Sequence, residues 1–202
     1  MNRTLEYYEH NARPVARRYE GMGFRSAIDR LARMVRPDAR VLELGCGSGR
    51  DAAYLLSLGV NVEATDGSTA MLEQANELHP ELLGRTTQLV LPGVLPYPDG
   101  HFDAVMTWAM LMHLSAEDIP DVIREIARVT SSGGVLAYAV TTSRRGLSQS
   151  GDDPDGRHFT CFSVAEWERI HTAAGYVTVD SEERDDLSGR PGIRWATFFA
   201  RK

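Results

Sequence analysis

Apolar side chains at the start of the chain recur every three or four residues, a spacing that lines one face of a helix. The first of these segments covers residues 5–22, and Pro14 within it is expected to break or kink the helix. A second segment covers 24–35, beginning at Phe24 and ending where a proline follows. Residues 1–36 are therefore predicted to form a helical N-terminal segment.

Beyond this segment, short apolar runs of strand length alternate with segments of helical spacing. Strands are expected at 41–44, 61–65, 87–91, 102–108, 135–141, 176–181 and 194–200, and helices at 51–58, 69–78, 118–129 and 163–174. Such alternation implies βαβ units, and hence a mostly parallel sheet with helices on both faces. The predicted fold class is doubly wound α/β.

Capping signals mark the ends of the later helices. Ser115 with Asp118, and Ser163 with Glu166, have the spacing of a capping box. The pair at 133–134, Gly-Gly, is expected to end the helix that begins near Asp118.

Length and charge narrow the class of protein. The chain has 202 residues, so 1–202 is expected to form a single domain, and its net charge of −6 argues against nucleic acid or an anionic membrane as partner. The two cysteines lie far apart and outside any CxxC pattern, so no metal site is expected. The N-terminus lacks the apolar stretch of a signal peptide, and we expect the protein in the cytoplasm.

The strongest chemical signal is a glycine-rich turn between the first predicted strand and the helix after it. Gly45, Gly47 and Gly49 there let a ligand approach the backbone, and Asp66 follows 21 positions after Gly45, where an acid can hold ribose hydroxyls. An adenosine-containing ligand is therefore predicted. A dinucleotide fingerprint would place its third glycine at Arg50, which argues against a nicotinamide-dependent oxidoreductase.

This turn resembles the hhDhGCGxG motif of the class I S-adenosylmethionine-dependent methyltransferases, with Glu43 for the commoner aspartate. Segments 66–71, 95–103 and 132–136 are similar to further segments of that superfamily, so the resemblance covers nearly the whole chain. It implies a Rossmann-like, seven-stranded sheet with an antiparallel last strand. It also implies S-adenosyl-L-methionine as cofactor, and S-adenosyl-L-homocysteine as product.

The resemblance assigns the cofactor site. The glycines would admit the methionine end, Arg50 would pair with its carboxylate, Asp66 would hold the ribose, and Met71, Leu91 and Trp108 would flank the adenine or the sulfonium. No acid stands in 90–94 to receive the adenine amino group, so stacking and backbone contacts are expected instead. The predicted cofactor residues are Gly45, Cys46, Gly47, Gly49, Arg50, Asp66, Gly67, Ser68, Met71, Leu91 and Trp108.

Candidates for the acceptor side come from three parts of the chain. His113 follows the fourth predicted strand and is the one candidate general base, or else a histidine that only packs. Tyr7 and Tyr8 belong to the N-terminal segment 1–36, which either closes over the cofactor as a lid or packs on the sheet. The loop 142–160 is expected on the substrate side, with Arg157 and His158 meeting substrate or only solvent.

The predicted function is methyl transfer to an O, N, S or C nucleophile of a small molecule. Two alternatives stay open: a protein that binds S-adenosylmethionine without turnover, and, less favoured, a nicotinamide-dependent oxidoreductase. The expected partner is a small-molecule acceptor, with no nucleic acid or membrane, and the chain is expected to be a monomer or a homodimer.

Overall fold

The fold of this computed structural model, which describes residues 2–22 and 25–202, is built on a seven-stranded sheet. Phe24, placed in the second helix by the hydrophobic pattern, lies outside the described residues. The strand order is β3-β2-β1-β4-β5-β7-β6. The strands are β1 (Arg40–Leu44), β2 (Asn61–Asp66), β3 (Thr86–Gln88), β4 (Phe102–Trp108), β5 (Thr130–Arg144), β6 (Val177–Asp185) and β7 (Ile193–Arg201).

Strand direction confirms the predicted fold class. The pairs among β1 to β5 are parallel, whereas β7 runs antiparallel to both β5 and β6. Strand β1 lies between β2 and β4, so the order of the strands reverses at this point. Open sheets of this type bind ligands at the carboxyl ends of the strands beside such a reversal.

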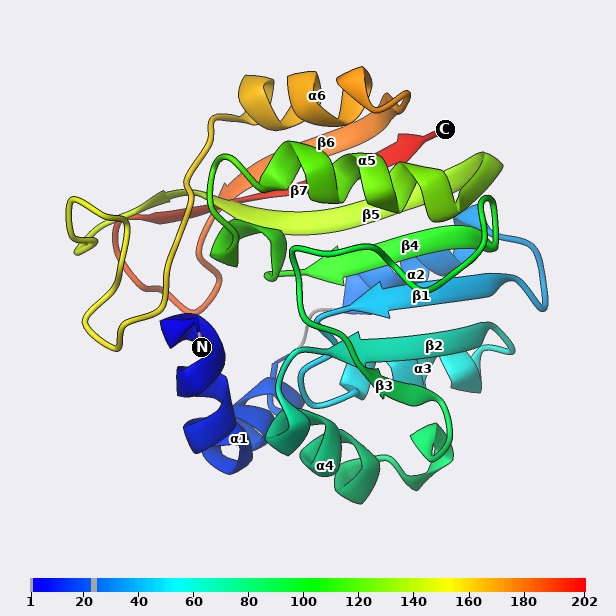
Figure 1. The fold of residues 1–202 in the computed structure, drawn as a ribbon, viewed down its shortest axis with the longest axis horizontal. Coiled ribbons are helices and arrows are strands. Elements are labelled where there is room, and N and C mark those ends of the chain that lie inside the picture. Colours follow the sequence, from blue (N-terminus) through cyan, green and yellow to red (C-terminus); the bar gives the residue numbers. More distant parts are fainter. Residues whose placement is uncertain (1, 23–24) are drawn as a thin grey trace.

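Helices cover both faces of the sheet, as predicted (Figure 1). Successive residues of one strand contact opposite layers, as Val41 and Leu42 of β1 do. Because both faces are buried, the inner strands read as continuous apolar runs. One face carries α2 (Arg25–Met34), α3 (Arg50–Ser57) and α4 (Thr69–Leu78), and the other carries α5 (Ile119–Val129) and α6 (Val164–Ala173).

The N-terminal helix α1 (Arg3–Glu20) lies beside α4, near the carboxyl ends of the strands (Figure 1). Pro14 stays inside this helix, and the backbone departs from helical geometry three residues earlier, at Asn11 (φ −115°, ψ 16°). A proline disturbs the turn that precedes it, because it lacks an N–H and its ring crowds an earlier carbonyl. The predicted kink is therefore present, while the break is not.

Several predicted element ends differ from the structure. The pair at 133–134 lies inside β5 and does not end a helix; α5 ends earlier, at Val129. Strand β3 is shorter than predicted and ends at Gln88. Ser115 bonds Asp118 without capping α5, whereas Ser163 and Glu166 form the complete capping box predicted for α6.

In the described ranges, no helix combines the length and the apolar character that crossing a bilayer requires.

Candidate cofactor and acceptor site

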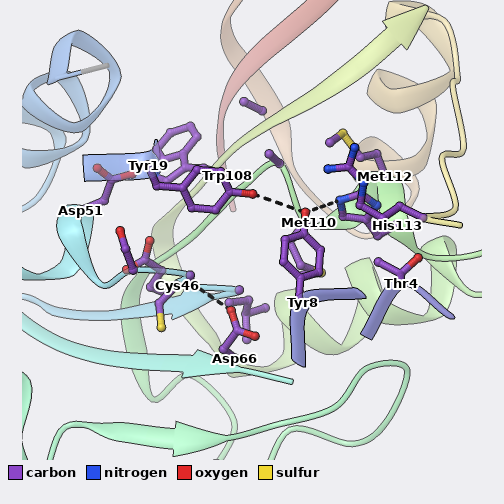
Figure 2. A pocket seen from close by; sticks show the side chains of 18 of the residues that line it. Thr4, Tyr8, Tyr19, Cys46, Asp51, Asp66, Trp108, Met110, Met112 and His113 are labelled. Carbon is purple, nitrogen blue, oxygen red and sulfur yellow. Dashed lines mark hydrogen bonds between the residues drawn. The ribbon is translucent and has the colours of Figure 1, made fainter. Parts of the chain in front are cut away.

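A cavity of about 490 Å³ opens at the carboxyl ends of β1, β2 and β4, where the strand order reverses (Figure 2). Its walls come from α1, from the turns after these strands and from the β6–β7 hairpin. The structure brings eleven of the predicted site residues to this lining. They are Gly45, Cys46, Gly47, Arg50, Asp66, Gly67, Leu91, Trp108, Tyr8, His113 and Arg157.

The glycine-rich turn is tied to the end of β2. The backbone N–H groups of Gly45 and Cys46 both donate to the carbonyl of Thr65, at 2.8 Å. Gly45 has φ +77°, and a Cβ there would lie 2.7 Å from the side chain of Met110, so the turn requires glycine for both conformation and space. Burial raises the pKa of the Cys46 thiol well above its usual value, which leaves it neutral and unsuited to act as a nucleophile.

Asp66 at the end of β2 turns its carboxylate toward the turn. One oxygen accepts from the Gly47 N–H at 2.9 Å and the other from the Ser68 N–H at 2.9 Å. Burial raises the pKa of this carboxyl, and these hydrogen bonds oppose the rise. The carboxylate lines the cavity and has lone pairs left for hydroxyl groups of a ligand.

Glu43 on β1 is a site residue that the sequence analysis noted only as a replacement for the commoner aspartate of the motif. Its side chain lines the cavity and the residue is 2% exposed, yet Oε2 has no hydrogen-bond partner. Burial is the main cause that raises the pKa of this carboxyl well above its usual value, and nearby Asp51 adds to the rise. An unsatisfied buried carboxylate oxygen calls for a cationic or protonated partner.

Arg50, predicted to pair with the carboxylate of the methionine end, lines the cavity and already makes hydrogen bonds within the protein. Its guanidinium pairs with Asp51 and donates to the backbone carbonyls of Tyr19 and Met22, at 2.5 and 2.8 Å. It therefore fastens the end of α1 to the start of α3.

Three predicted cofactor residues lie outside the cavity lining. Gly49 is the left-handed N-cap of α3, where a Cβ would lie 2.5 Å from Leu82. The Ser68 hydroxyl caps α4 and donates to Glu9 of α1 at 2.6 Å. Met71 is 1% exposed and packs beneath α1. These motif positions build the fold around the site.

The acceptor-side candidates also divide. Tyr7 packs edge-on against Tyr8 outside the lining. The His158 side chain bonds Thr160 at 3.1 Å, lies 3.4 Å from Asp152, and borders a second cavity of about 270 Å³. Toward the main cavity, the backbone carbonyl of His158 accepts a hydrogen bond from the ring of His113.

His113 has a fixed tautomer. Its Nδ1 lies 2.7 Å from the His158 carbonyl, which can only accept, so Nδ1 carries the proton and Nε2 is a lone-pair acceptor. The Tyr8 hydroxyl, 3.2 Å away, donates to Nε2, and the Tyr19 hydroxyl donates to Tyr8 at 3.4 Å (Figure 2). Burial lowers the pKa of His113 to about 4. The imidazole is therefore neutral at pH 7, with Nε2 turned to the tyrosines of α1.

Unsatisfied polar atoms gather at the cavity. Among the described residues, five buried side-chain atoms lack a partner, and three of these belong to lining residues: Glu43, Trp108 and Arg144. Native proteins leave few such groups, so this concentration points to a bound ligand. Within the same part of the chain, no three His, Cys, Asp or Glu residues are grouped to hold a metal ion.

Known proteins that are similar to this chain include methyltransferases. A family model described as a methyltransferase domain matches residues 42–138. The demethylmenaquinone methyltransferase of Beutenbergia cavernae is 37% identical over 120 residues, which cover 57% of this chain and 45% of that protein. A probable S-adenosyl-L-methionine-dependent methyltransferase, TehB of Haemophilus influenzae, is 28% identical over 211 residues, which cover 98% of this chain and 69% of that one. The chain thus spans less than half the length of the first of these relatives.

A solved structure has the same fold. The 1,6-didemethyltoxoflavin-N1-methyltransferase of Burkholderia thailandensis, solved with its substrate and S-adenosylhomocysteine bound, matches with a TM-score of 0.71 at 22% identity. The match covers 96% of this chain and 84% of that one. Residues 42–138 thus match a methyltransferase domain, and in its strand order and glycine turn the chain resembles the class I S-adenosylmethionine-dependent methyltransferases.

Proposed function

We propose that this protein transfers a methyl group from S-adenosylmethionine to an O, N, S or C nucleophile of a small molecule. The observation that carries the proposal is the glycine turn locked to Asp66 beside the unsatisfied Glu43 carboxylate, all facing one cavity. When bound, the cofactor supplies a methyl group on a sulfonium, whose S–C bond breaks with its electrons left on sulfur as the acceptor lone pair bonds to carbon.

The chain's residues fit the cofactor chemically. Asp66 would accept from the ribose hydroxyls, and the free Oε2 of Glu43 would accept from the ammonium of the methionine end. Gly45 and Gly47 leave the backbone open to that end, and Trp108 with Leu91 offers apolar walls for the adenine. The segment before β4 lines the cavity with Leu89, Val90 and Leu91, in keeping with an adenine held without a carboxylate.

Residues of α1 and of the turn after β4 would serve the acceptor. Nε2 of His113 is positioned to take a proton from an O–H or N–H acceptor, directly or through the Tyr8 hydroxyl. The pKa of Tyr8 is raised well above 10, mainly by burial, so the hydroxyl stays protonated and keeps Nε2 oriented. Positioning and exclusion of water would supply most of the catalysis.

We further propose a single domain in which residues 1–36 form a helical lid and 142–160 a substrate-side wall. The support is that Tyr8 and Tyr19 of α1, and Arg144, Arg157 and Phe159 around the loop, line one cavity. An enclosure of about 490 Å³, which must also hold the cofactor, favours a small acceptor over nucleic acid. We expect a cytoplasmic monomer or homodimer.

Turnover is the test. The protein is incubated with methyl-labelled S-adenosylmethionine and a metabolite extract, and the small molecules are separated. Label in a new small-molecule product, absent without the protein, supports the proposal. Label that reaches no acceptor, while S-adenosylhomocysteine still binds, would favour a binding protein without turnover.

A further inference from the structure

The charge of the cavity lining changes sign along the sheet. At the β1–β2 side the charged lining residues of the sheet and its turns are the acids Glu43, Asp51 and Asp66, with Arg50 paired to Asp51, and α1 adds Arg18 to the lining. At the β5–β7–β6 side, the described lining residues include one acid, Asp186, which pairs with Arg190, and three further arginines: Arg144, Arg157 and Arg184. The chain as a whole has a net charge of −6, so its composition does not account for arginines gathered here.

At the centre of this arginine side, two guanidinium groups share one carboxylate. Oδ2 of Asp153 accepts from Arg144 Nη2 at 3.1 Å and from Arg157 Nε and Nη2 at 3.0 and 2.6 Å. Its Oδ1 is taken by the backbone N–H groups of Asp155 and Arg157. Asp153 neutralises one of the two guanidinium charges, and the other carboxylate nearby, that of Asp155, lies 3.6 Å from Arg157 Nη2 with its side chain 57% exposed. Only 13% of each arginine side chain and 2% of the Asp153 side chain is exposed.

Each of the two guanidinium groups packs against an aromatic ring. Arg144 lies 4.1 Å from the centre of the Phe159 ring, and Arg157 lies 4.6 Å from that of Tyr7. Nε of Arg144 is buried and has no hydrogen-bond partner. Burial is the main cause that lowers the pKa of Arg144; the positive charges of Arg157 and Arg190 add to this effect, and Asp153 opposes it. A rigid, under-neutralised guanidinium pair is suited to an oxyanion, which matches its planar donors.

Resting on the proposed function, we propose that the methyl acceptor is a small anion whose carboxylate or comparable oxyanion group binds at Arg144 and Arg157. The site is next to the candidate base. Arg157 lies close enough to Tyr8 to oppose the rise of its pKa, and the Tyr8 hydroxyl is 3.2 Å from His113 Nε2. An anion held by the arginines thus keeps the rest of the acceptor beside Tyr8 and His113. The acidic side of the cavity remains for the cationic cofactor.

Binding of matched probes tests this subsite. With S-adenosylhomocysteine saturating, the affinities of benzoate, its uncharged amide benzamide and inorganic phosphate are measured by calorimetry. Benzoate or phosphate is expected to bind, and benzamide at least about tenfold more weakly than benzoate. Arg144→Gln should weaken binding of the anion about tenfold. The matched control Arg145→Gln changes an exposed neighbour outside the lining, and should bind like the wild type.

Further measurements distinguish failure of the proposed anion subsite from failure of the proposed function. Arg144→Lys keeps the charge beside Asp153 and should recover part of the preference for the anion. Unchanged affinity for S-adenosylhomocysteine in each variant shows that the fold is retained. If neither anion binds, or if Arg144→Gln binds anions as the wild type does, the anion subsite is overturned and the arginines only hold the loop. If the wild type fails to bind S-adenosylhomocysteine, the proposed function is what fails.

Discussion

At the scale of single residues, burial decides which groups are ready for chemistry. His113, Glu43 and Cys46 all line the cavity, and burial shifts the pKa of each in the direction that favours its neutral form. His113 remains the candidate base because its neutral form keeps a lone pair on Nε2, although the lowered pKa also reduces its affinity for a proton. Two side-chain predictions follow at this scale.

Replacing His113 should change how stability depends on pH. The pKa of His113 is lowered to about 4 in the folded protein, whereas an unfolded histidine has a pKa near 6.5. Between pH 4 and pH 6.5 the imidazole is therefore protonated in the unfolded chain and neutral in the folded one. The contribution of His113 to the free energy of unfolding is fully present above pH 6.5. It is lost as the pH falls toward 4, and the loss is up to about 3 kcal/mol. In His113→Asn the free energy of unfolding, measured with urea, should therefore fall less over this range. His10→Asn, at an exposed position of α1, should follow the wild type, and equal pH slopes in all three proteins would contradict the burial of His113.

Glu43→Gln should separate ligand binding from folding. The amide keeps the size of the side chain but loses the charge proposed to meet the cofactor's ammonium, so the dissociation constant for S-adenosylhomocysteine should rise about tenfold. The melting temperature without ligand should stay or rise, because a buried carboxylate with an unsatisfied oxygen is removed. Glu73→Gln, exposed on α4, is the matched control. An unchanged affinity in the Glu43 variant, measured by calorimetry, would exclude the proposed contact.

At the scale of elements, α1 supplies a wall of the cavity whose other walls lie at the carboxyl ends of the strands. Its tyrosines reach the turn after β4. The contacts that hold it include the bonds of Arg50 to its C-terminal end, the bond of Ser68 to Glu9, and the packing of apolar side chains on Met71. Two of these anchors, Ser68 and Met71, come from the motif segment that the sequence assigned to the cofactor. The motif thus also fixes the helix that encloses the site.

Loss of the Arg50 anchor should loosen α1 selectively. Arg50→Gln removes the hydrogen bonds to the Tyr19 and Met22 carbonyls, so amide protons of α1 should exchange faster with deuterium while those of the central strands keep their protection. Arg17→Gln changes an exposed arginine of the same helix and should leave exchange unaltered. Uniformly faster exchange over sheet and helix together would show that Arg50 acts on global stability instead.

The sequence predicts elements well where local chemistry decides them. Alternating apolar runs located all seven strands, and the Ser163–Glu166 spacing located a helix start that the structure confirms. Prediction failed where distant contacts decide. Gly134 continues a strand because β5 pairs with β7 far along the chain, and His113 meets Tyr8 across 105 positions. No local pattern could show that the ring of His113 is held by the His158 backbone, or that Arg144 and Arg157 share Asp153.

At the scale of the whole molecule, the fold and the charge distribution agree on one division. The sheet reverses its strand order at β1 and β4, and the cavity lies there; acids predominate in its lining at the β1–β2 side and arginines at the β5–β7–β6 side. The net charge of −6 conceals this division, which composition alone could not have predicted. The fold therefore provides one site with two chemically distinct halves, for a cationic cofactor and for an acceptor.

Thermal melting tests whether the glycine turn and Asp66 bind the adenosine and methionine parts of S-adenosylmethionine. S-adenosylhomocysteine at a hundredfold excess over its dissociation constant should raise the melting temperature by roughly 5–10 °C, whereas NAD should leave it unchanged. Asp66→Asn, which preserves the size of the side chain, should reduce that rise. A rise with NAD and none with S-adenosylhomocysteine would contradict the account.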